Sequence, residues 1–194
     1  MEKRDVEKAQ GGDMKAFERL VKRHEKQVYS VALRMTGNES DAFDLSQETF
    51  IRMFQSIKSF KGDCAFSTWL HRIATNICLD FLRKQKRRFA NEEAWEIESE
   101  EKTASREVPD LRYSPETAME KRQVQEAVQA ALLTLSPEHR QVLLLREISG
   151  LSYAEISETL DMEVGTVKSR IARAREQLRI KLTESGNFPG AGSV

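Results

Sequence analysis

Residues 151–182 constrain the fold most, because they read as two amphipathic helices joined by a three-residue turn. Ser152 and Glu155 have the spacing of a capping box, which predicts where the first helix begins. In the second helix, apolar residues recur at alternating spacings of three and four, as on the buried side of an α-helix. This segment therefore predicts a helix-turn-helix. Its second helix has the apolar residues Val164, Val167, Ile171, Ala174 and Leu178.

The opposite side of that second helix carries residue types that suit a DNA groove. Short side chains let a helix approach base edges in the major groove, and flanking cations meet phosphates. A two-helix corner with a merely solvated basic face is the alternative. The helix cap, the turn, the row of apolar residues and the outer face all agree with one another, and this agreement favours DNA binding. The outward residues are Thr166, Ser169, Ala172 and Arg173, with Lys168, Arg170, Arg175 and Arg179 on the flanks.

Helical periodicity continues through nearly all of the 194 residues, which predicts an all-α protein. Lys plus Arg and Asp plus Glu both number 31, so a DNA-binding chain of this composition must separate its charges in space. Cys64 and Cys78 lack metal-ligand spacing and are expected to be reduced thiols. The sequence shows no signal peptide, and no apolar run approaches the ~20 residues of a membrane span. We therefore expect a cytoplasmic protein without a metal.

The N-terminal half predicts four helices. Residues 1–12 predict a short one, and Asp13 then caps a long helix that ends at Gly37. Further helices are expected at about residues 39–57 and 68–86, the latter capped by Ser67 or Thr68. Their buried faces are expected to hold Ala42, Leu45, Phe50, Phe54 and Ile57, and Leu70, Ile73, Ala74, Ile77 and Phe81.

Four polar residues, Asp41, Asp44, Gln47 and Glu48, share one side of the helix at 39–57. From the residues alone, ordinary solvated surface is the favoured interpretation of this acidic patch. A carboxylate metal site is excluded, because no Glu-x-x-His motif lies on another helix.

The loop at 59–66 has an aromatic residue near each end, and the helix after it has an unusual outer side. Trp69, Arg72, Asn76 and Arg83 lie there, followed by a basic run to residue 88. Aromatic rings stack on bases, Asn can read a base edge and cations follow the backbone, so this side suits single-stranded DNA. Trp69 taken alone is equally compatible with a place in the core.

From residue 89 to 116 the periodicity breaks, and nine acidic residues stand against three basic ones, which predicts a flexible acidic linker. Ser114-Pro115 and Ser136-Pro137 then each predict the start of a helix. Residues 185–194 are Gly-rich and predict a disordered tail. The first of the two helices is expected to bury Ala118, Val124, Val128, Ala131 and Leu135.

Four motifs in this order resemble the extracytoplasmic-function subgroup of bacterial sigma-70-type RNA polymerase sigma factors. They are GDMKAFERLV at 12–21, DAFDLSQETFIRMF at 41–54, SFKGDCAFSTWLHRIATNICLDFLRKQKRR at 59–88, and LSPEHRQVLLLREISGLSYAEISETLDMEVGTVKSRIARARE at 135–176. The resemblance implies a polymerase-binding and −10 domain at 1–88, an acidic linker at 89–113 and a −35 domain at 114–184. Glu163, where many members have proline, and Ala172, where some have a larger side chain, depart from the family pattern.

The resemblance also implies roles for individual residues. It assigns Asp41, Asp44, Gln47 and Glu48 to core RNA polymerase, which replaces the solvated-surface interpretation. It assigns a flipped-out base of the −10 element to a pocket with Phe60 as a wall. The −10 set is Phe60, Lys61, Thr68, Trp69, Arg72, Asn76 and Arg83, and the −35 set is Arg146, Thr166, Lys168, Ser169, Arg170 and Arg173.

The implied partners are core RNA polymerase, promoter DNA as a −35 duplex and a −10 single strand, and an anti-sigma factor that would hold the chain at the membrane. No cofactor is implied. A stand-alone helix-turn-helix regulator is the alternative, but the single motif and the second DNA-type surface near Asn76 disfavour it. An enzyme is disfavoured because no nucleophile elbow, phosphate loop or convergent catalytic set is present.

Overall fold

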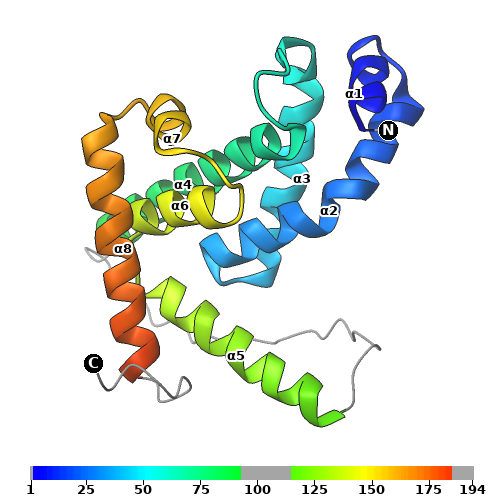
Figure 1. The fold of residues 1–194 in the computed structure, drawn as a ribbon. Helices are drawn as coiled ribbons and strands as arrows, with labels where there is room; N and C mark the ends of the chain where they lie inside the picture. Colours follow the sequence, from blue (N-terminus) through cyan, green and yellow to red (C-terminus); the bar gives the residue numbers. More distant parts are fainter. Residues whose placement is uncertain (1, 93–114, 185–194) are drawn as a thin grey trace.

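The computed structural model describes residues 2–92 and 115–184, and within these ranges it contains α-helices, one short 3₁₀-helix and no strand. The all-α prediction is therefore confirmed (Figure 1). None of the described helices is both long and apolar enough to cross a bilayer. The elements are α1 (Glu2–Gln10), α2 (Met14–Thr36), α3 (Glu39–Ser56), η1 (Ile57–Ser59), α4 (Phe66–Glu92), α5 (Pro115–Leu133), α6 (Pro137–Glu147), α7 (Tyr153–Leu160) and α8 (Val164–Glu184).

Most helix ends lie where the capping residues predict them. The Asp13 carboxylate accepts a hydrogen bond from the Ala16 amide, and Gly37 ends α2 in the left-handed conformation at φ 74°. Ser152 and Glu155 form the predicted capping box. The predicted cap of α4 is wrong, because α4 begins at Phe66 and so contains Ser67 and Thr68 in its first turn.

The predicted linker also begins too early, since α4 continues to Glu92. The remainder of that linker, the expected cap at Ser114 and the expected tail at 185–194 lie outside the described residues.

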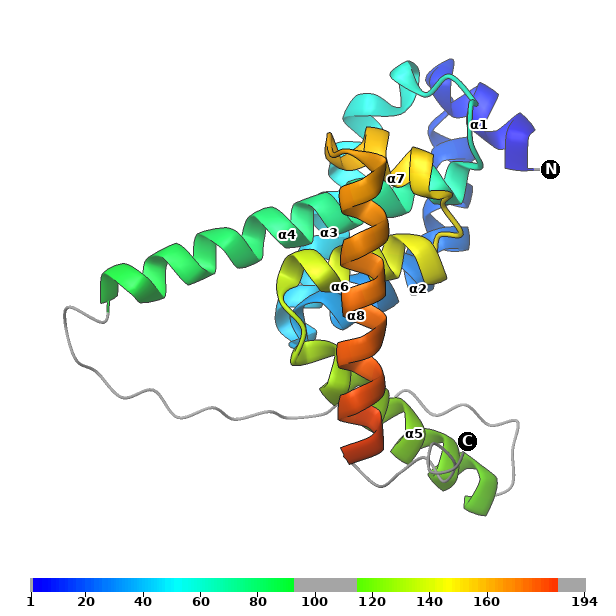
Figure 2. The same ribbon diagram turned by 60° about the vertical axis from the view of Figure 1, so that its left-hand side comes forward.

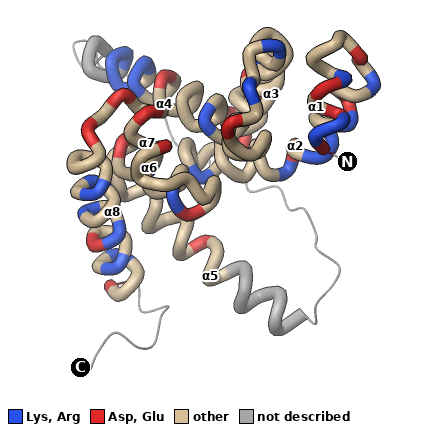
Figure 3. Tube along the Cα trace, turned by 45° about the horizontal axis from the view of Figure 1, so that its top comes forward, with Lys and Arg blue, Asp and Glu red and all other residues tan. Residues whose placement is uncertain are grey.

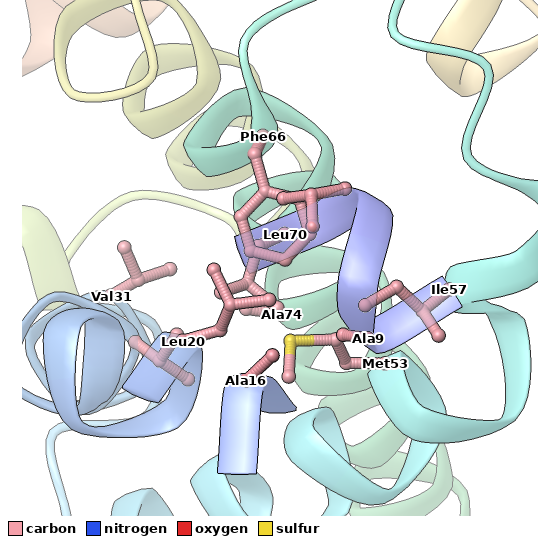
Figure 4. Close-up of a cluster of buried hydrophobic side chains, with 11 residues drawn as sticks. Ala9, Ala16, Leu20, Val31, Met53, Ile57, Phe66, Leu70 and Ala74 are labelled. Atoms are coloured by element: carbon pink, nitrogen blue, oxygen red, sulfur yellow. The ribbon is translucent and has the colours of Figure 1, made fainter. Parts of the chain in front are cut away.

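Helices α1 to α4 surround one apolar core, in which side chains of all four converge (Figure 4). Leu20, Met53 and Leu70 are fully buried there, and each such side chain contributes roughly 1.5–3 kcal/mol to stability. Phe54 was expected in this core but is 53% exposed. The rotation of α3 turns the neighbouring residue Met53 inward instead, and the Phe54 ring meets Phe17 edge-on at the surface, with 5.2 Å between ring centroids.

Helices α6 to α8 form a second core around the predicted helix-turn-helix. Ile156, Val167 and Ile171 are fully buried in it. Val167 and Ile171 confirm the central part of the apolar side predicted for α8. Val164 and Val124 were predicted to be buried, and that prediction is wrong, because they are 37% and 40% exposed. Val164 lies at the first position of α8, ahead of its buried residues, and on α5 the described buried positions are Ala131 and Leu132.

A third apolar cluster joins the two halves of the chain. It combines Met35 and Leu79 from the N-terminal half with Leu132, Leu143 and Leu144 from the C-terminal half. Helix α6 packs against α4, and α5 packs against α2. Figures 1 and 2 show α6 beside α4 in both views, with α8 crossing them. The two halves therefore meet directly, an arrangement that helical periodicity does not predict.

Candidate nucleic-acid and polymerase interfaces

The acidic patch on α3 is accessible to a partner. Asp44, Gln47 and Glu48 are exposed, and Asp41 is half-buried beside them. Burial, and then the neighbouring charge of Asp44, raise the pKa of the Asp41 carboxyl. Glu48 is 3.9 Å from Arg52 in an exposed pair, which holds it only weakly. The patch can therefore accept cations from a partner.

Large apolar side chains flank this acidic patch. Phe43, Ile51 and Phe54 are 57%, 52% and 53% exposed on α3. A helix that exposes several large apolar residues next to charged ones is suited to contact another protein. The sequence assigned only the acidic residues to this surface, because Phe54 fitted the apolar period and was expected in the core.

The loop between η1 and α4 is fixed by α1 and by its own aromatic residues. The Gln10 side-chain amide donates to the carbonyl oxygens of Ile57 at 3.0 Å and Phe60 at 2.8 Å. Phe60, Phe66 and Trp69 pack together, with ring centroids 5.1–5.6 Å apart. Trp69 is half-buried in this cluster. Its position is therefore intermediate between the two alternatives, a DNA-facing residue and a core residue.

A pocket of about 400 Å³ lies between this loop and α1, with Phe60 and Lys61 among its lining residues. Asn76 is absent from the lining and lies further along α4. Its Oδ1 atom accepts a hydrogen bond of 2.9 Å from the Gln141 side chain of α6. The structure therefore brings Phe60 and Lys61 together but does not bring Asn76 into the same pocket.

Two other predicted −10 residues also meet the C-terminal half. The Thr68 hydroxyl donates to the Ser149 carbonyl oxygen at 3.2 Å, and the Arg83 guanidinium is 3.7 Å from the Glu138 carboxylate. Sequence periodicity identified the α4 residues of these contacts but not their partners on α6 and just after it, because nothing in the spacing of Glu138 or Ser149 indicates a distant contact.

The outward face of α8 is as the sequence predicts. Thr166, Lys168, Ser169 and Arg173 are exposed, and Arg170 is half-buried on the flank. The Ser169 hydroxyl donates to the Thr166 carbonyl oxygen at 2.9 Å, so its oxygen can still accept from a base. Figure 3 shows Lys and Arg gathered along α8 and toward the end of α4.

Ion pairs separate the cations of α8 into two groups. Arg175 pairs with Glu147 at 2.6 Å, and Arg179 pairs with Glu176 at 2.7 Å. Lys168, Arg170 and Arg173 form no ion pair with a described residue. The cations nearest the N-terminal half of α8 are therefore the ones available to phosphates or bases.

The Tyr153 ring lies against two cations, Arg146 of α6 and Lys168 of α8. The Arg146 guanidinium lies 4.9 Å from the Tyr153 ring centroid, and the Lys168 ammonium lies 6.0 Å from it. Arg146 also donates to the Leu151 carbonyl oxygen at 2.7 Å. Arg146 thus supports the start of the helix-turn-helix from within the protein.

Comparison with known proteins places these surfaces in a family. Residues 20–88 match the family model Sigma-70 region 2, and residues 125–178 match Sigma-70, region 4. The fold, the exposed basic face of α8 and these two matches thus define a sigma-70-type factor. The chain belongs to the extracytoplasmic-function RNA polymerase sigma factors, since its similarity to curated members covers nearly its whole length.

Three relatives illustrate the match. The ECF RNA polymerase sigma-E factors of Haemophilus influenzae and Escherichia coli K12 are each 38% identical over 177 residues, which are 91% of this chain and 93% and 92% of theirs. The ECF RNA polymerase sigma factor SigE of Mycolicibacterium smegmatis is 42% identical over 166 residues. That match covers 86% of this chain and 61% of the relative.

Solved structures give the same result for the fold. The sigma factor RpoE of Bartonella quintana, in complex with the anti-sigma factor NepR, has a TM-score of 0.62 at 25% identity. That match covers 87% of this chain and 98% of RpoE. CnrH, in complex with the cytosolic domain of CnrY, has a TM-score of 0.59 at 25% identity over 93% of this chain and 96% of CnrH.

Proposed function

We propose that this chain is the promoter-specificity subunit of an RNA polymerase holoenzyme. It binds core polymerase through the acidic and apolar side of α3, and it binds the −35 duplex through the outward face of α8. The loop before α4 and the outer side of α4 bind the unpaired −10 strand. Residues 1–88 carry the polymerase and −10 surfaces, and residues 114–184 carry the −35 surface. The polymerase supplies the chemistry, so the chain itself has no catalytic role.

The observation that carries this proposal is the separation of charge on a chain with no net charge. An acidic surface on α3 and basic surfaces on α4 and α8 are all accessible on one molecule. A basic polymerase segment and DNA can therefore bind at the same time without competing for one site. A stand-alone regulator has no use for the exposed acidic and apolar side of α3.

A run-off transcription assay tests the proposal. The full chain is added to core RNA polymerase on a library of promoter fragments, with core polymerase alone as the control. Discrete transcripts that require the chain are expected, and their templates should share two short elements. A chain that binds promoter duplexes equally well without polymerase, and adds no transcripts, would favour the stand-alone regulator.

The proposal includes an anti-sigma factor as a further partner. A relative of the same fold, RpoE of Bartonella quintana, has been solved with the anti-sigma factor NepR. Amphipathic helices in two halves give such a protein two surfaces to hold. Co-purification from the native cell under non-inducing conditions should therefore yield a second, non-polymerase protein. Recovery of polymerase subunits only would contradict this part of the proposal.

A further inference from the structure

We propose that Gln10 of α1 determines which base enters the pocket between α1 and the loop before α4. Its side-chain oxygen accepts a hydrogen bond from the exocyclic amino group of an unpaired adenine or cytosine. The inference rests on the proposed function, in which this loop binds the −10 strand. It adds the class of base and a residue on α1, outside the set that the sequence predicts for that strand.

The pocket has the size and the walls that an extruded base requires. Its volume is about 400 Å³, within the range of small-molecule sites. Phe60 and Phe66 both line it, and Phe60 is fixed against Trp69 with 5.1 Å between ring centroids. An extruded base loses its stacking in the duplex, and an aromatic wall replaces that stacking.

Two lysines at the pocket suit the DNA backbone on either side of such a base. Lys3 of α1 and Lys61 of the loop are exposed lining residues. Of the two lining carboxylates, Glu2 lies 2.6 Å from His24 Nε2, and Glu7 is exposed. Since Lys61 already belongs to the set predicted for the −10 strand, the pocket continues that surface onto α1.

The Gln10 amide is held in one orientation. Its NH₂ group donates to the carbonyl oxygens of Ile57 at 3.0 Å and Phe60 at 2.8 Å, which uses both N–H donors. The reverse orientation would place the amide oxygen against those two carbonyl oxygens. Among the described residues no donor contacts Gln10 Oε1. Gln10 lines the pocket, so it presents a fixed acceptor there.

Helix α1 is itself held firmly, which keeps this acceptor in place. The buried Asp5 carboxylate lies 2.8 Å from the Arg19 guanidinium and 3.5 Å from that of Arg23, both on α2. Val6 and Ala9 are buried in the core that α1 to α4 share, where Figure 4 shows Ala9 among the converging side chains. An acceptor on a fixed element discriminates between ligands without first paying for its own ordering.

A fixed acceptor selects bases by their amino groups. Adenine carries the N6 amino group and cytosine the N4 amino group, whereas guanine and thymine carry the carbonyl oxygens O6 and O4 at the same ring positions. A carbonyl oxygen facing Gln10 Oε1 would leave two acceptors with no hydrogen between them, and both would have lost water. The pocket is therefore expected to accept adenine or cytosine and to disfavour thymine and guanine.

Base analogues in a promoter fork test this contact. Holoenzyme made with the full chain is titrated with fork templates that carry an unpaired −10 strand, taken from the promoters that run-off transcription defines. Each unpaired adenine is replaced in turn by purine, and each cytosine by 2-pyrimidinone, which lack only the amino group. At the position that occupies the pocket, affinity should fall about threefold to tenfold, as expected for one hydrogen bond.

Gln10→Leu separates reading a base from supporting the loop. In this variant the analogue at that position should bind as well as the natural base, even if both bind more weakly. The controls are Ser59→Ala, which removes a hydrogen bond from the Ser59 hydroxyl to the Ser56 carbonyl oxygen, and Glu7→Ala, which removes the neighbouring carboxylate. Both controls should keep the discrimination. If Gln10→Leu weakened binding but left the discrimination unchanged, Gln10 would only support the loop and the proposal would be wrong.

Cys64 lines the pocket and can report which base enters it. A two-carbon thiol tether on the amino nitrogen, protected as a mixed disulfide, is placed at each unpaired adenine or cytosine. The Cys64 thiolate displaces the small thiol and forms a disulfide with the tether. The reaction is run at mildly alkaline pH, because burial raises the pKa of Cys64. Cys78 is buried, which raises its pKa to about 12, so it does not compete.

A cross-link is expected at the position where the analogue weakens binding, and Cys64→Ser should abolish it. A cross-link at a position where the analogue has no effect would refute the amino-group contact and leave the −10 assignment of the loop intact. If no position cross-links, and abasic sites throughout the unpaired strand leave affinity unchanged in a holoenzyme that still transcribes, the −10 assignment of the loop is itself wrong. If abasic sites weaken binding but no position cross-links, a base is bound elsewhere and the pocket proposal fails alone.

Discussion

The guanidinium of Arg140 donates to the main-chain carbonyl oxygen of Met35, which lies in the other half of the chain. It also donates to the carbonyls of Leu132 at 2.9 Å, Leu133 at 2.9 Å and Leu135 at 3.1 Å. One buried cation thus satisfies carbonyls at the C-terminal ends of α2 and α5, where unpaired carbonyls and helix dipoles favour positive charge. Burial lowers the pKa of Arg140 to about 10, so it remains charged at neutral pH.

Arg140→Lys should therefore destabilise the protein although it keeps the charge. A lysine ammonium has three donors on a flexible stem and cannot bond four carbonyls at once. We expect the free energy of unfolding to fall by about 1–3 kcal/mol, measured by urea denaturation, because buried carbonyls lose their donors. Arg87→Lys, at an exposed position of α4, is the control and should change stability by less than about 0.5 kcal/mol. Equal midpoints for the two variants would contradict the role of Arg140.

Charge reversal on α3 tests the polymerase surface. Asp44→Lys with Glu48→Lys should weaken binding to core polymerase by several kcal/mol, because cations would face the basic partner that the patch is proposed to bind. The matched control is Glu18→Lys with Glu25→Lys, which makes the same charge change at exposed positions of α2. Titration with labelled core polymerase measures both. Similar affinities for the two variants would show that α3 is not the contact.

Local signals in the sequence were sufficient for the helices and most of their caps. Asp13, Ser152 and Gly37 predict helix ends because capping depends on a few neighbouring residues. Phe54 was misplaced because an apolar period tolerates a shift of one residue, and only the packing of α3 against α2 and α4 selects Met53 for the core.

For the contacts at the candidate −10 site, the sequence predicted the residues on α4 but not their partners in the C-terminal half. Asn76 and Arg83 stand out because their residue types suit DNA on a helix face. Gln141 and Glu138, which meet them, lie 65 and 55 positions further along the chain, and a single sequence holds no signal for such long-range pairs. The direct contact between the halves therefore had to come from the three-dimensional structure.

His71 should make stability depend on pH in the acidic range. It is 5% exposed, its Nε2 atom has no hydrogen-bond partner among the described residues, and its Nδ1 atom is 3.1 Å from Ser149 Oγ. Burial first, and then the nearby His24, lower its pKa from 6.5 to about 4. Between these values the unfolded chain binds the proton and the folded chain does not, so stability decreases as pH falls from 6.5 to about 4.

The expected loss over this range is up to about 3 kcal/mol. Urea denaturation at several pH values measures it. His71→Gln removes the titrating group and should flatten this part of the profile, even if it lowers stability overall. An unchanged slope in that variant would assign the pH dependence to other groups.

Residues of α8 that contact bases and residues that contact phosphates should respond differently to mutation. Arg173 and Ser169 point away from the buried residues Val167 and Ile171, so they are proposed to contact −35 bases. Arg173→Ala should then cost about 1–3 kcal/mol on the preferred sequence and relax selectivity at one position. Removing a base contact weakens only the sequence that made it.

Lys168 lies on the flank of the helix, with its ammonium 6.0 Å from the Tyr153 ring centroid, which suits a phosphate contact. Lys168→Ala should weaken binding to all sequences about equally and should lower the salt slope by about one, because one fewer counterion is released. Both variants are measured in the holoenzyme on a set of −35 sequences over a range of salt concentrations. If Lys168→Ala altered sequence preference while Arg173→Ala altered only the salt slope, α8 would lie in the groove with a different rotation. In that case Lys168 would read bases and Arg173 would contact the backbone.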